Sequence, residues 1–220
     1  MKIMVTGSTG FVGRHLIPEL LKQGHEILEI TIEPELSESI FGATTSRYTL
    51  TEDQEYLVAC VKEYSPAIII HLASFLTSAD DYLTLQKLLK ANVEFFSRIL
   101  DCTRSIDLKL CINTGSFSEY FEGREYLKPA YLYSATKIAA RSLLDYYARI
   151  GSYKQTTAVP YTIYGGLDSQ KKIIDYIYDS LDNPATTDLS PGEQTLDFIH
   201  ISDIVSYYLY VVENYNNYPA

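Results

Sequence analysis

The sequence has no tryptophan, two methionines and only three cysteines in 220 residues. Cys60, Cys102 and Cys111 form no C-x-x-C pair and have no neighbouring histidine that could complete a zinc site. We therefore expect no metal centre, and we interpret the cysteines as free thiols in a reducing cytoplasm.

Positive charge and long hydrophobic runs are also scarce. The chain carries 18 Lys and Arg against 28 Asp and Glu, a net charge of -10. Nucleic-acid backbones are bound by clustered Lys and Arg, so a nucleic-acid partner is not expected, whereas a helix N-terminus could still bind an anionic small molecule. The first apolar stretch, Ile3 to Val5, soon meets Gly7, so no signal peptide or membrane span is predicted. We expect a soluble, cytoplasmic protein that binds no membrane.

Short apolar runs alternate with longer helical patterns along the chain. Strands are predicted at residues 2–6, 26–32, 47–50, 67–72, 108–114 and 156–159, and helices at 11–23, 51–64, 80–105 and 131–150. Thr51 is the predicted cap of the second helix. This alternation is typical of an α/β protein with a doubly wound parallel sheet, the Rossmann fold.

A glycine turn, TGSTGFVG at residues 6–13, separates the first strand from the first helix. Gly7 permits the tight turn, Gly10 lets a pyrophosphate approach the backbone, and Gly13 lets the helix pack closely on the sheet. The helix starts at Phe11 and Val12. Its N-terminus presents free N–H groups to the phosphates. The position of this turn predicts a nicotinamide-dinucleotide site.

A tyrosine and a lysine, Tyr133 and Lys137, are four residues apart and therefore on one face of a helix. A nearby ammonium favours the phenolate, so we expect Lys137 to lower the pKa of Tyr133 and to hold the nicotinamide ribose. Ser116 follows the strand at 108–114 and could hold the substrate oxygen. The predicted chemistry is hydride transfer between nicotinamide and a secondary alcohol or ketone, with Tyr133 moving the proton.

Together these motifs resemble those of the extended short-chain dehydrogenases, the group of nucleotide-sugar epimerases, dehydratases and reductases. The resemblance covers nearly the whole chain and makes Ser116 the counterpart of the family's catalytic Ser/Thr. It also implies that Leu72, Ala73 and Asn92 belong to the segments that line the cofactor and brace the sheet. By the same resemblance, Pro160, Tyr161 and Ile163 belong to the segment beside the nicotinamide and the sugar.

Cofactor choice depends on the second and third strands. NAD-preferring relatives place an acid where this chain has Thr31, and Arg14 beside the glycine turn could offset a 2′-phosphate. We therefore expect NAD(P), with NADP(H) favoured. Thr49 replaces the acid that relatives set against adenine, and Leu50 is expected in the same part of the site.

The residues that follow Ser116 limit the class of reaction and substrate. The 4,6-dehydratases of this group carry Thr-Asp-Glu, whereas this chain reads Ser-Phe-Ser at 116–118, so dehydration is not expected. Segments 168–174, 190–194 and 197–203 are similar to those of nucleotide-sugar 4-keto reductases of the CDP-abequose and CDP-paratose synthase type. Leu196 stands where epimerases usually have Arg, and His200 is interpreted as structural.

Several alternatives remain open at this point. The chain could be a 4-keto reductase or an epimerase of a nucleotide-activated sugar, a non-catalytic dinucleotide-binding regulator, or a methyltransferase on a similar sheet. Tyr133 and Lys137 favour the enzyme over the last two. We expect a dinucleotide-binding part at 1–160, and at 161–220 partial segments of a small, apparently truncated C-terminal substrate lobe packed on it as one unit. A homodimer is one alternative for the assembly.

Overall fold

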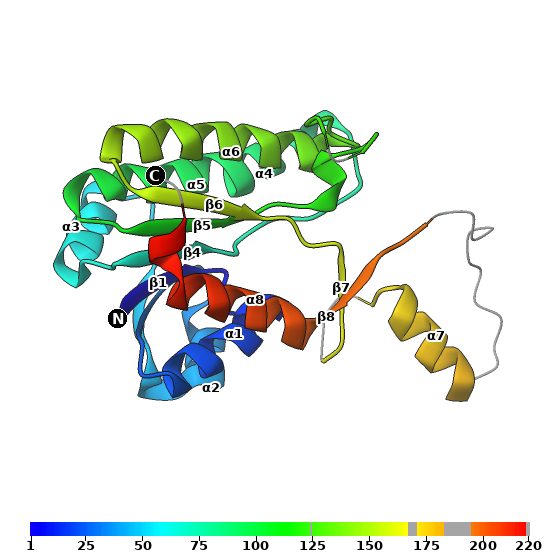
Figure 1. The fold of residues 1–220 in the computed structure, drawn as a ribbon, viewed down its shortest axis with the longest axis horizontal. Helices are drawn as coiled ribbons and strands as arrows, with labels where there is room; N and C mark the ends of the chain where they lie inside the picture. The colour runs from blue at the N-terminus through cyan, green and yellow to red at the C-terminus, as the bar shows by residue number, and fades with distance from the viewer. Residues whose placement is uncertain (124, 167–170, 183–194, 219–220) are drawn as a thin grey trace.

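The computed structural model describes residues 1–123, 125–166, 171–182 and 195–218. Its main feature is a six-stranded, fully parallel sheet with the order β3-β2-β1-β4-β5-β6 (Figure 1). The strands are β1 (Lys2–Thr6), β2 (Glu26–Thr31), β3 (Ser46–Thr49), β4 (Ile68–His71), β5 (Leu110–Thr114) and β6 (Lys154–Ala158). This order confirms the predicted doubly wound Rossmann fold.

Helices cover both faces of the sheet (Figure 1). One face carries α1 (Phe11–Lys22), α2 (Pro34–Phe41) and α8 (Ile201–Glu213), and α8 packs against α1. The other face carries α3 (Gln54–Tyr64), α5 (Phe95–Cys102) and α6 (Leu132–Gly151), and α4 (Tyr82–Leu88) leads into α5 through a π-helical turn, Leu89–Glu94. Beside the sheet, β7 (Thr162–Tyr164) and β8 (Phe198–His200) form a parallel pair, and α7 (Ile173–Asp182) lies beyond it.

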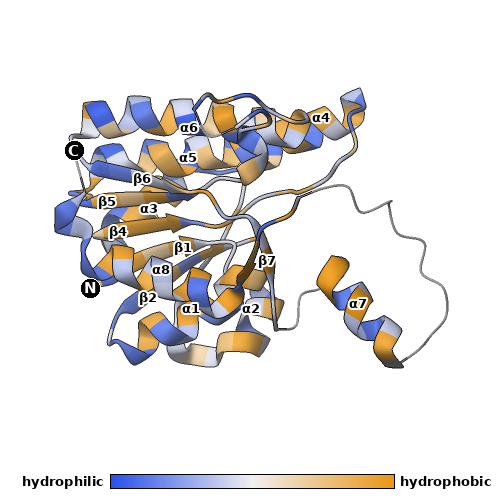
Figure 2. Ribbon diagram, turned by 45° about the vertical axis from the view of Figure 1, so that its right-hand side comes forward, coloured by the Kyte–Doolittle hydropathy of each residue, from blue (hydrophilic) through white to orange (hydrophobic). Residues whose placement is uncertain are grey.

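The core consists of two apolar layers because both faces of the sheet are covered. Successive side chains of a strand point to opposite faces, so Ile3 and Val5 pack under α1 and α8 while Met4 packs under the opposite helices. Strand β4 repeats this pattern, and all four of its residues are buried. Figure 2 shows the hydrophobic colouring of β4 and β5 between the two helix layers. A parallel sheet buried on both sides requires such continuous apolar runs.

Some elements differ from the sequence-based expectation. The helix predicted from Thr51 begins at Gln54, and its cap is Asp53, whose side chain accepts a hydrogen bond from the Tyr56 N–H at 2.9 Å. Helix α2 was not predicted; its first residue is Pro34, which suits a first helical turn because the missing N–H has no partner there. The predicted helix 80–105 begins at Tyr82 and contains the π-helical turn.

The topology places the candidate site. The chain winds outward in one direction from β1 to β3 and in the other from β4 to β6, so a crevice opens where the carboxyl ends of β1 and β4 meet. The glycine turn and the residues after β2, β3, β4 and β5 all lie at this edge. Of the downstream segments named above, residues 168–170 and 190–194 lie outside the described residues. Within the described ranges, no helix combines the length and apolar character needed to cross a membrane.

Candidate functional site

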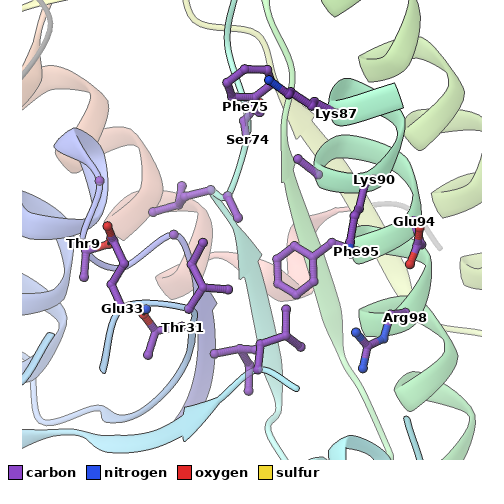
Figure 3. A pocket seen from close by; sticks show the side chains of 18 of the residues that line it. Thr9, Thr31, Glu33, Ser74, Phe75, Lys87, Lys90, Glu94, Phe95 and Arg98 are labelled. Carbon is purple, nitrogen blue, oxygen red and sulfur yellow. Dashed lines mark hydrogen bonds between the residues drawn. The ribbon is translucent and has the colours of Figure 1, made fainter. Parts of the chain in front are cut away.

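A cavity of about 840 Å³ lies at the carboxyl edge of the sheet. Figure 3 shows its two walls: the glycine turn and the end of β2 on one side, and the helix that runs from α4 into α5 on the other. Six of the residues predicted for the cofactor line it: Gly7, Gly10, Thr31, Leu50, Leu72 and Ala73. The carboxyl-edge location and this lining make it the candidate dinucleotide site.

The glycine turn has the shape that a pyrophosphate requires. A Cβ at Gly13 would lie 2.4 Å from the Gly7 carbonyl oxygen, and one at Gly7 would lie 2.6 Å from the Ala73 nitrogen, so both positions are closed to side chains. A Cβ at Gly10 would make a milder contact, 3.3 Å from the Gly7 carbonyl oxygen, which a shift of a few tenths of an ångström would relieve. Gly10 is also the N-cap of α1 and makes no side-chain cap hydrogen bond. The turn therefore leaves room and backbone donors for an anion at the helix N-terminus.

The opposite wall was missed from the sequence, although its residues share one helix face. They recur with helical spacing and are Lys87, Lys90, Ala91, Glu94, Phe95 and Arg98. Arg98 crosses to the end of β3, where it donates to the Thr51 carbonyl at 2.6 Å and to Gln54 at 2.9 Å. This arginine ties α5 to the loop after β3, which forms the floor beside Leu50.

Asn92 was expected to line the cofactor, and in the structure its contacts are those of a brace. It is buried, accepts a hydrogen bond from the Phe75 N–H at 2.8 Å, and donates to the Phe75 carbonyl and to Thr136 at 3.1 Å each. It therefore links the segment after β4 to α6, while Ser74 and Phe75 themselves line the cavity. Both follow a strand at the carboxyl edge, which is the signal that could have identified them.

Tyr133 and Lys137 lie side by side in the first turns of α6, and both are almost fully buried. The Lys137 Nζ is 6.0 Å from the centre of the Tyr133 ring. Burial raises the pKa of Tyr133, and a hydrogen bond with the Ser74 side chain opposes that rise. The expectation that Lys137 would depress this pKa is therefore wrong for the structure as it stands, because removal from water disfavours the phenolate more than its neighbours favour it.

Lys137 is itself strongly affected by burial. Loss of water lowers its pKa to about 8, an effect that Glu119 opposes and Arg141 reinforces. Near neutral pH the amine is thus mainly protonated but close to its titration point, so a small change in its surroundings changes its charge.

Ser116 is held in a tight turn that follows β5. It is the N-cap of a 3₁₀ turn, Phe117–Glu119, and its N–H donates to the Glu119 carboxylate at 2.6 Å. Glu119 is fully buried, and its second oxygen lies 2.8 Å from an Arg141 nitrogen. Glu119 and Arg141 therefore form an ion pair, but their atoms are not aligned for a hydrogen bond. The carboxylate therefore joins the Ser116 backbone to α6, the helix that carries Tyr133.

The side chains of Arg14 and Glu33 bear on the choice between NAD and NADP, and both contact the glycine turn. Arg14 donates from Nε to the Thr9 carbonyl at 2.6 Å, inside the glycine turn. Glu33 was not predicted, yet it lines the cavity just beyond Thr31, and its carboxylate accepts from the Thr9 hydroxyl at 2.7 Å (Figure 3). An acidic side chain is thus present at the end of β2, two residues later than expected.

The segment after β6 lies beside Ser116 rather than in the main cavity. The Pro160 carbonyl accepts from the Phe117 N–H at 3.2 Å, and the Tyr161 ring stacks on the Phe117 ring with centroids 5.2 Å apart. Pro160 and Tyr161 border a second hollow of about 360 Å³, and Ile163 packs against the core. His200 caps α8 by accepting from the Ser202 N–H at 3.2 Å, which fits the structural role expected of it.

Comparison with known proteins assigns the family. The model of the NAD dependent epimerase/dehydratase family matches residues 3–220, and the chain belongs to this family. CDP-abequose synthase from Yersinia pseudotuberculosis is 31% identical over 216 residues, which are 98% of this chain and 75% of that protein. The dTDP-4-dehydro-6-deoxy-D-allose reductase of Streptomyces bikiniensis is 24% identical and matches 99% of this chain and 74% of that protein. The chain thus spans about three quarters of these relatives.

Solved structures agree on the fold. UDP-glucuronic acid 4-epimerase from Bacillus cereus, in complex with UDP-glucuronic acid and NAD, superposes with a TM-score of 0.82 at 20% identity, covering 97% of this chain and 74% of that one. UDP-glucose 4-epimerase from Thermotoga maritima, with UDP-glucose, gives 0.83 at 18% identity, with 97% and 74% covered. The family-level prediction made from the glycine turn and the Tyr133–Lys137 pair is confirmed.

The milder contact at Gly10 leads to the first prediction. Gly10→Val should fold after a small adjustment of the turn, because the backbone there is not left-handed and its Cβ would meet the Gly7 carbonyl oxygen at 3.3 Å rather than at the 2.4 Å found for Gly13. The side chain should occupy the path of the pyrophosphate and abolish dinucleotide binding, as measured by calorimetry. A folded variant with unchanged affinity would contradict the placement of the cofactor. Gly13→Ala is a poor substitute for this test because its Cβ meets backbone.

The buried lysine leads to a second prediction, which needs no substrate. Folding lowers the pKa of Lys137 from 10.5 to about 8, so between these pH values the unfolded chain holds more protons at this position than the folded chain. The unfolding free energy of the wild type should therefore rise with pH across that window relative to Lys137→Met. Urea denaturation of both proteins at pH 7 to 10.5 measures the difference. A difference that stays flat with pH would contradict the burial of an ionisable amine here.

Proposed function

We propose that this protein is a nicotinamide-dependent oxidoreductase that reduces the 4-keto group of a nucleotide-activated sugar. One observation supports the proposal: Tyr133 and Lys137 lie side by side in the first turns of α6, and the turn that begins at Ser116 contacts this helix through Ser118 and Ser134, at the same edge of the sheet as the dinucleotide cavity. Ser74, which lines the cavity, is also a hydrogen-bond partner of Tyr133 and so connects the two parts of the site.

Each residue has a defined task in this proposal. When bound, a reduced nicotinamide would supply the hydride from its C4 to the keto carbon. Tyr133 donates a proton to the keto oxygen; its phenol is protonated at neutral pH, as a tyrosine in water is, and this is the form that reduction needs. Ser116 donates a hydrogen bond to the same oxygen and holds it in place. Lys137 is placed to hold the nicotinamide ribose and to influence Tyr133 by its charge.

The substrate class comes from the relatives. A CDP-abequose synthase and a dTDP-4-dehydro-6-deoxy-D-allose reductase both match almost the whole chain, so nucleotide-linked 4-keto sugars, with CDP first, are the substrates to test. We infer further that the protein is not a 4,6-dehydratase, since Phe117 and Ser118 replace the acid pair that dehydration needs. Phe117 stacks on Tyr161, which makes this position apolar.

For the cofactor, the contacts favour NAD(H), although Thr31 and Arg14 in the sequence favoured NADP(H). The Arg14 Nε donates to the turn backbone, whereas the Glu33 carboxylate lines the cavity at the end of β2. A carboxylate there can accept hydrogen bonds from the ribose hydroxyls and repels a 2′-phosphate. We therefore propose that Glu33 takes the part that an acid at position 31 plays in NAD-preferring relatives.

The chemistry is tested by removing the Tyr133 hydroxyl. Tyr133→Phe should keep the fold and cofactor affinity and lower kcat by roughly 10²- to 10⁴-fold, the usual contribution of a general acid. Turnover is measured on a panel of nucleotide sugars and nucleotide-linked 4-keto sugars with each nicotinamide cofactor. Net cofactor oxidation identifies a reductase, and isomerised product without net oxidation identifies an epimerase.

The same panel separates the remaining alternatives. Near-full turnover by Tyr133→Phe would show that the proton assignment is wrong. A wild type that binds cofactor but converts no sugar would favour the regulatory alternative instead. Sedimentation of the active preparation shows whether the working form is a homodimer.

Cofactor choice is tested at Glu33. Glu33→Gln should raise the affinity for NADP(H) relative to NAD(H) by about tenfold, because it removes one like charge from the 2′-phosphate. Glu52→Gln is the matched control, since Glu52 lines the same cavity but is paired with Lys90 on the other wall. Competitive titration of both cofactors gives the ratio. If wild type already prefers NADP(H), or if both variants shift equally, Glu33 does not set the choice.

A further inference from the structure

Three serine hydroxyls form a connected series between β5 and α6. Ser134, which follows Tyr133 on α6, donates from Oγ to the Ser118 Oγ at 3.0 Å. The Ser118 Oγ lies 2.8 Å from the Ser116 Oγ. Ser118 and Ser134 are buried, with 3% and 0% of their surface exposed, so water does not compete for these hydrogen bonds.

The direction of these bonds follows from the number of protons available. A hydroxyl has one proton to donate and two lone pairs to accept. The 2.8 Å contact by itself allows either hydroxyl to donate, but Ser134 donates to Ser118, and within the described residues the buried Ser118 proton has no acceptor other than the Ser116 oxygen, so we assign Ser118 as the donor to Ser116. The Ser118 N–H also faces that oxygen, at 3.3 Å. With both donors directed at it, the Ser116 oxygen accepts within the turn, and its own proton is left for a partner outside the turn.

The turn does not rely on these hydroxyls for its backbone position. The Ser116 N–H is held by Glu119, the Phe117 N–H by the Pro160 carbonyl at 3.2 Å, and the Ala130 N–H by the Ser118 carbonyl at 3.0 Å. Removal of the Ser118 or Ser134 hydroxyl therefore changes the hydrogen bonds available to the Ser116 side chain, while these backbone contacts remain.

We propose that Ser118 and Ser134 are positioning residues that hold Ser116 as a hydrogen-bond donor towards the substrate oxygen. The proposal rests on the proposed function, in which Ser116 and Tyr133 both donate to a keto oxygen. A keto oxygen has no proton of its own and can accept from both. Two oriented donors at the position where negative charge develops lower the barrier without reorganisation during the reaction.

The kinetic arm of the test uses Ser118→Ala and Ser134→Ala. Each should lower kcat on the 4-keto substrate by about tenfold, a change of about 1.4 kcal/mol, while cofactor affinity and melting temperature stay near those of wild type. Ser142→Ala is the control, because its hydroxyl lies on the same helix but donates to the Ile138 carbonyl on the exposed side. In a Ser116→Ala background, Ser118→Ala should cause no further loss. A further tenfold loss there would overturn the proposal, since the effect would not pass through Ser116.

The second arm needs no activity. NMR of protein with ¹³C-labelled serine reports the χ1 rotamer of Ser116, which should be single in wild type and partly averaged in Ser118→Ala, where the N–H of residue 118 is the donor that remains. An unchanged rotamer would overturn the positioning role even if turnover fell. If the rotamer becomes averaged but wild type converts none of the sugars, the proposed function fails while the hold on Ser116 stands.

Discussion

The site depends on backbone contact at the glycine turn. Gly7 lies against the backbone of Ala73 after β4, and Gly13 lies against the Gly7 carbonyl, with no space for a side chain at either glycine. These contacts bring the N-terminus of α1 to the point where the order of the sheet reverses. The rest of the site is organised around this point, because the loops after β2, β3 and β4 reach the same edge and form the remaining cavity lining.

Behind this edge lies a group of buried ionisable side chains whose charges affect one another. Lys137, Glu119 and Arg141 share a largely dry region, and Glu119 stabilises the lysine ammonium while Arg141 opposes it. His71 at the end of β4 belongs to the same region; burial and the nearby Lys137 lower its pKa well below the usual value, and it is paired with the Thr6 hydroxyl at 2.8 Å. A charge added or removed here changes the protonation of its neighbours as well as its own contacts.

Much of this organisation could be predicted because it rests on local signals. Residues 3–5 of β1 and 68–70 of β4 are uninterrupted apolar runs, and the glycine spacing identifies the turn with its helix. The wall formed by α4 and α5 was missed because helical spacing alone does not tell which face meets a cavity. The position of Glu33 was missed for a related reason: it depends on where the chain goes after β2, and the short helix starting at Pro34 turns it so that Glu33 meets Thr9.

The Tyr133–Lys137 pair shows how far spacing alone can carry a chemical argument. The four-residue spacing correctly predicted that the two side chains lie together, but it did not predict that both are buried away from water. In water the ammonium would favour the phenolate; with both groups buried, each charged form is penalised, and the phenol stays protonated. In the proposed reduction, the protonated phenol and the Ser116 hydroxyl would both donate to a keto oxygen, which has no proton of its own. Desolvation thus overrides the effect expected from the four-residue spacing, and it raises the pKa of Tyr133 instead of lowering it.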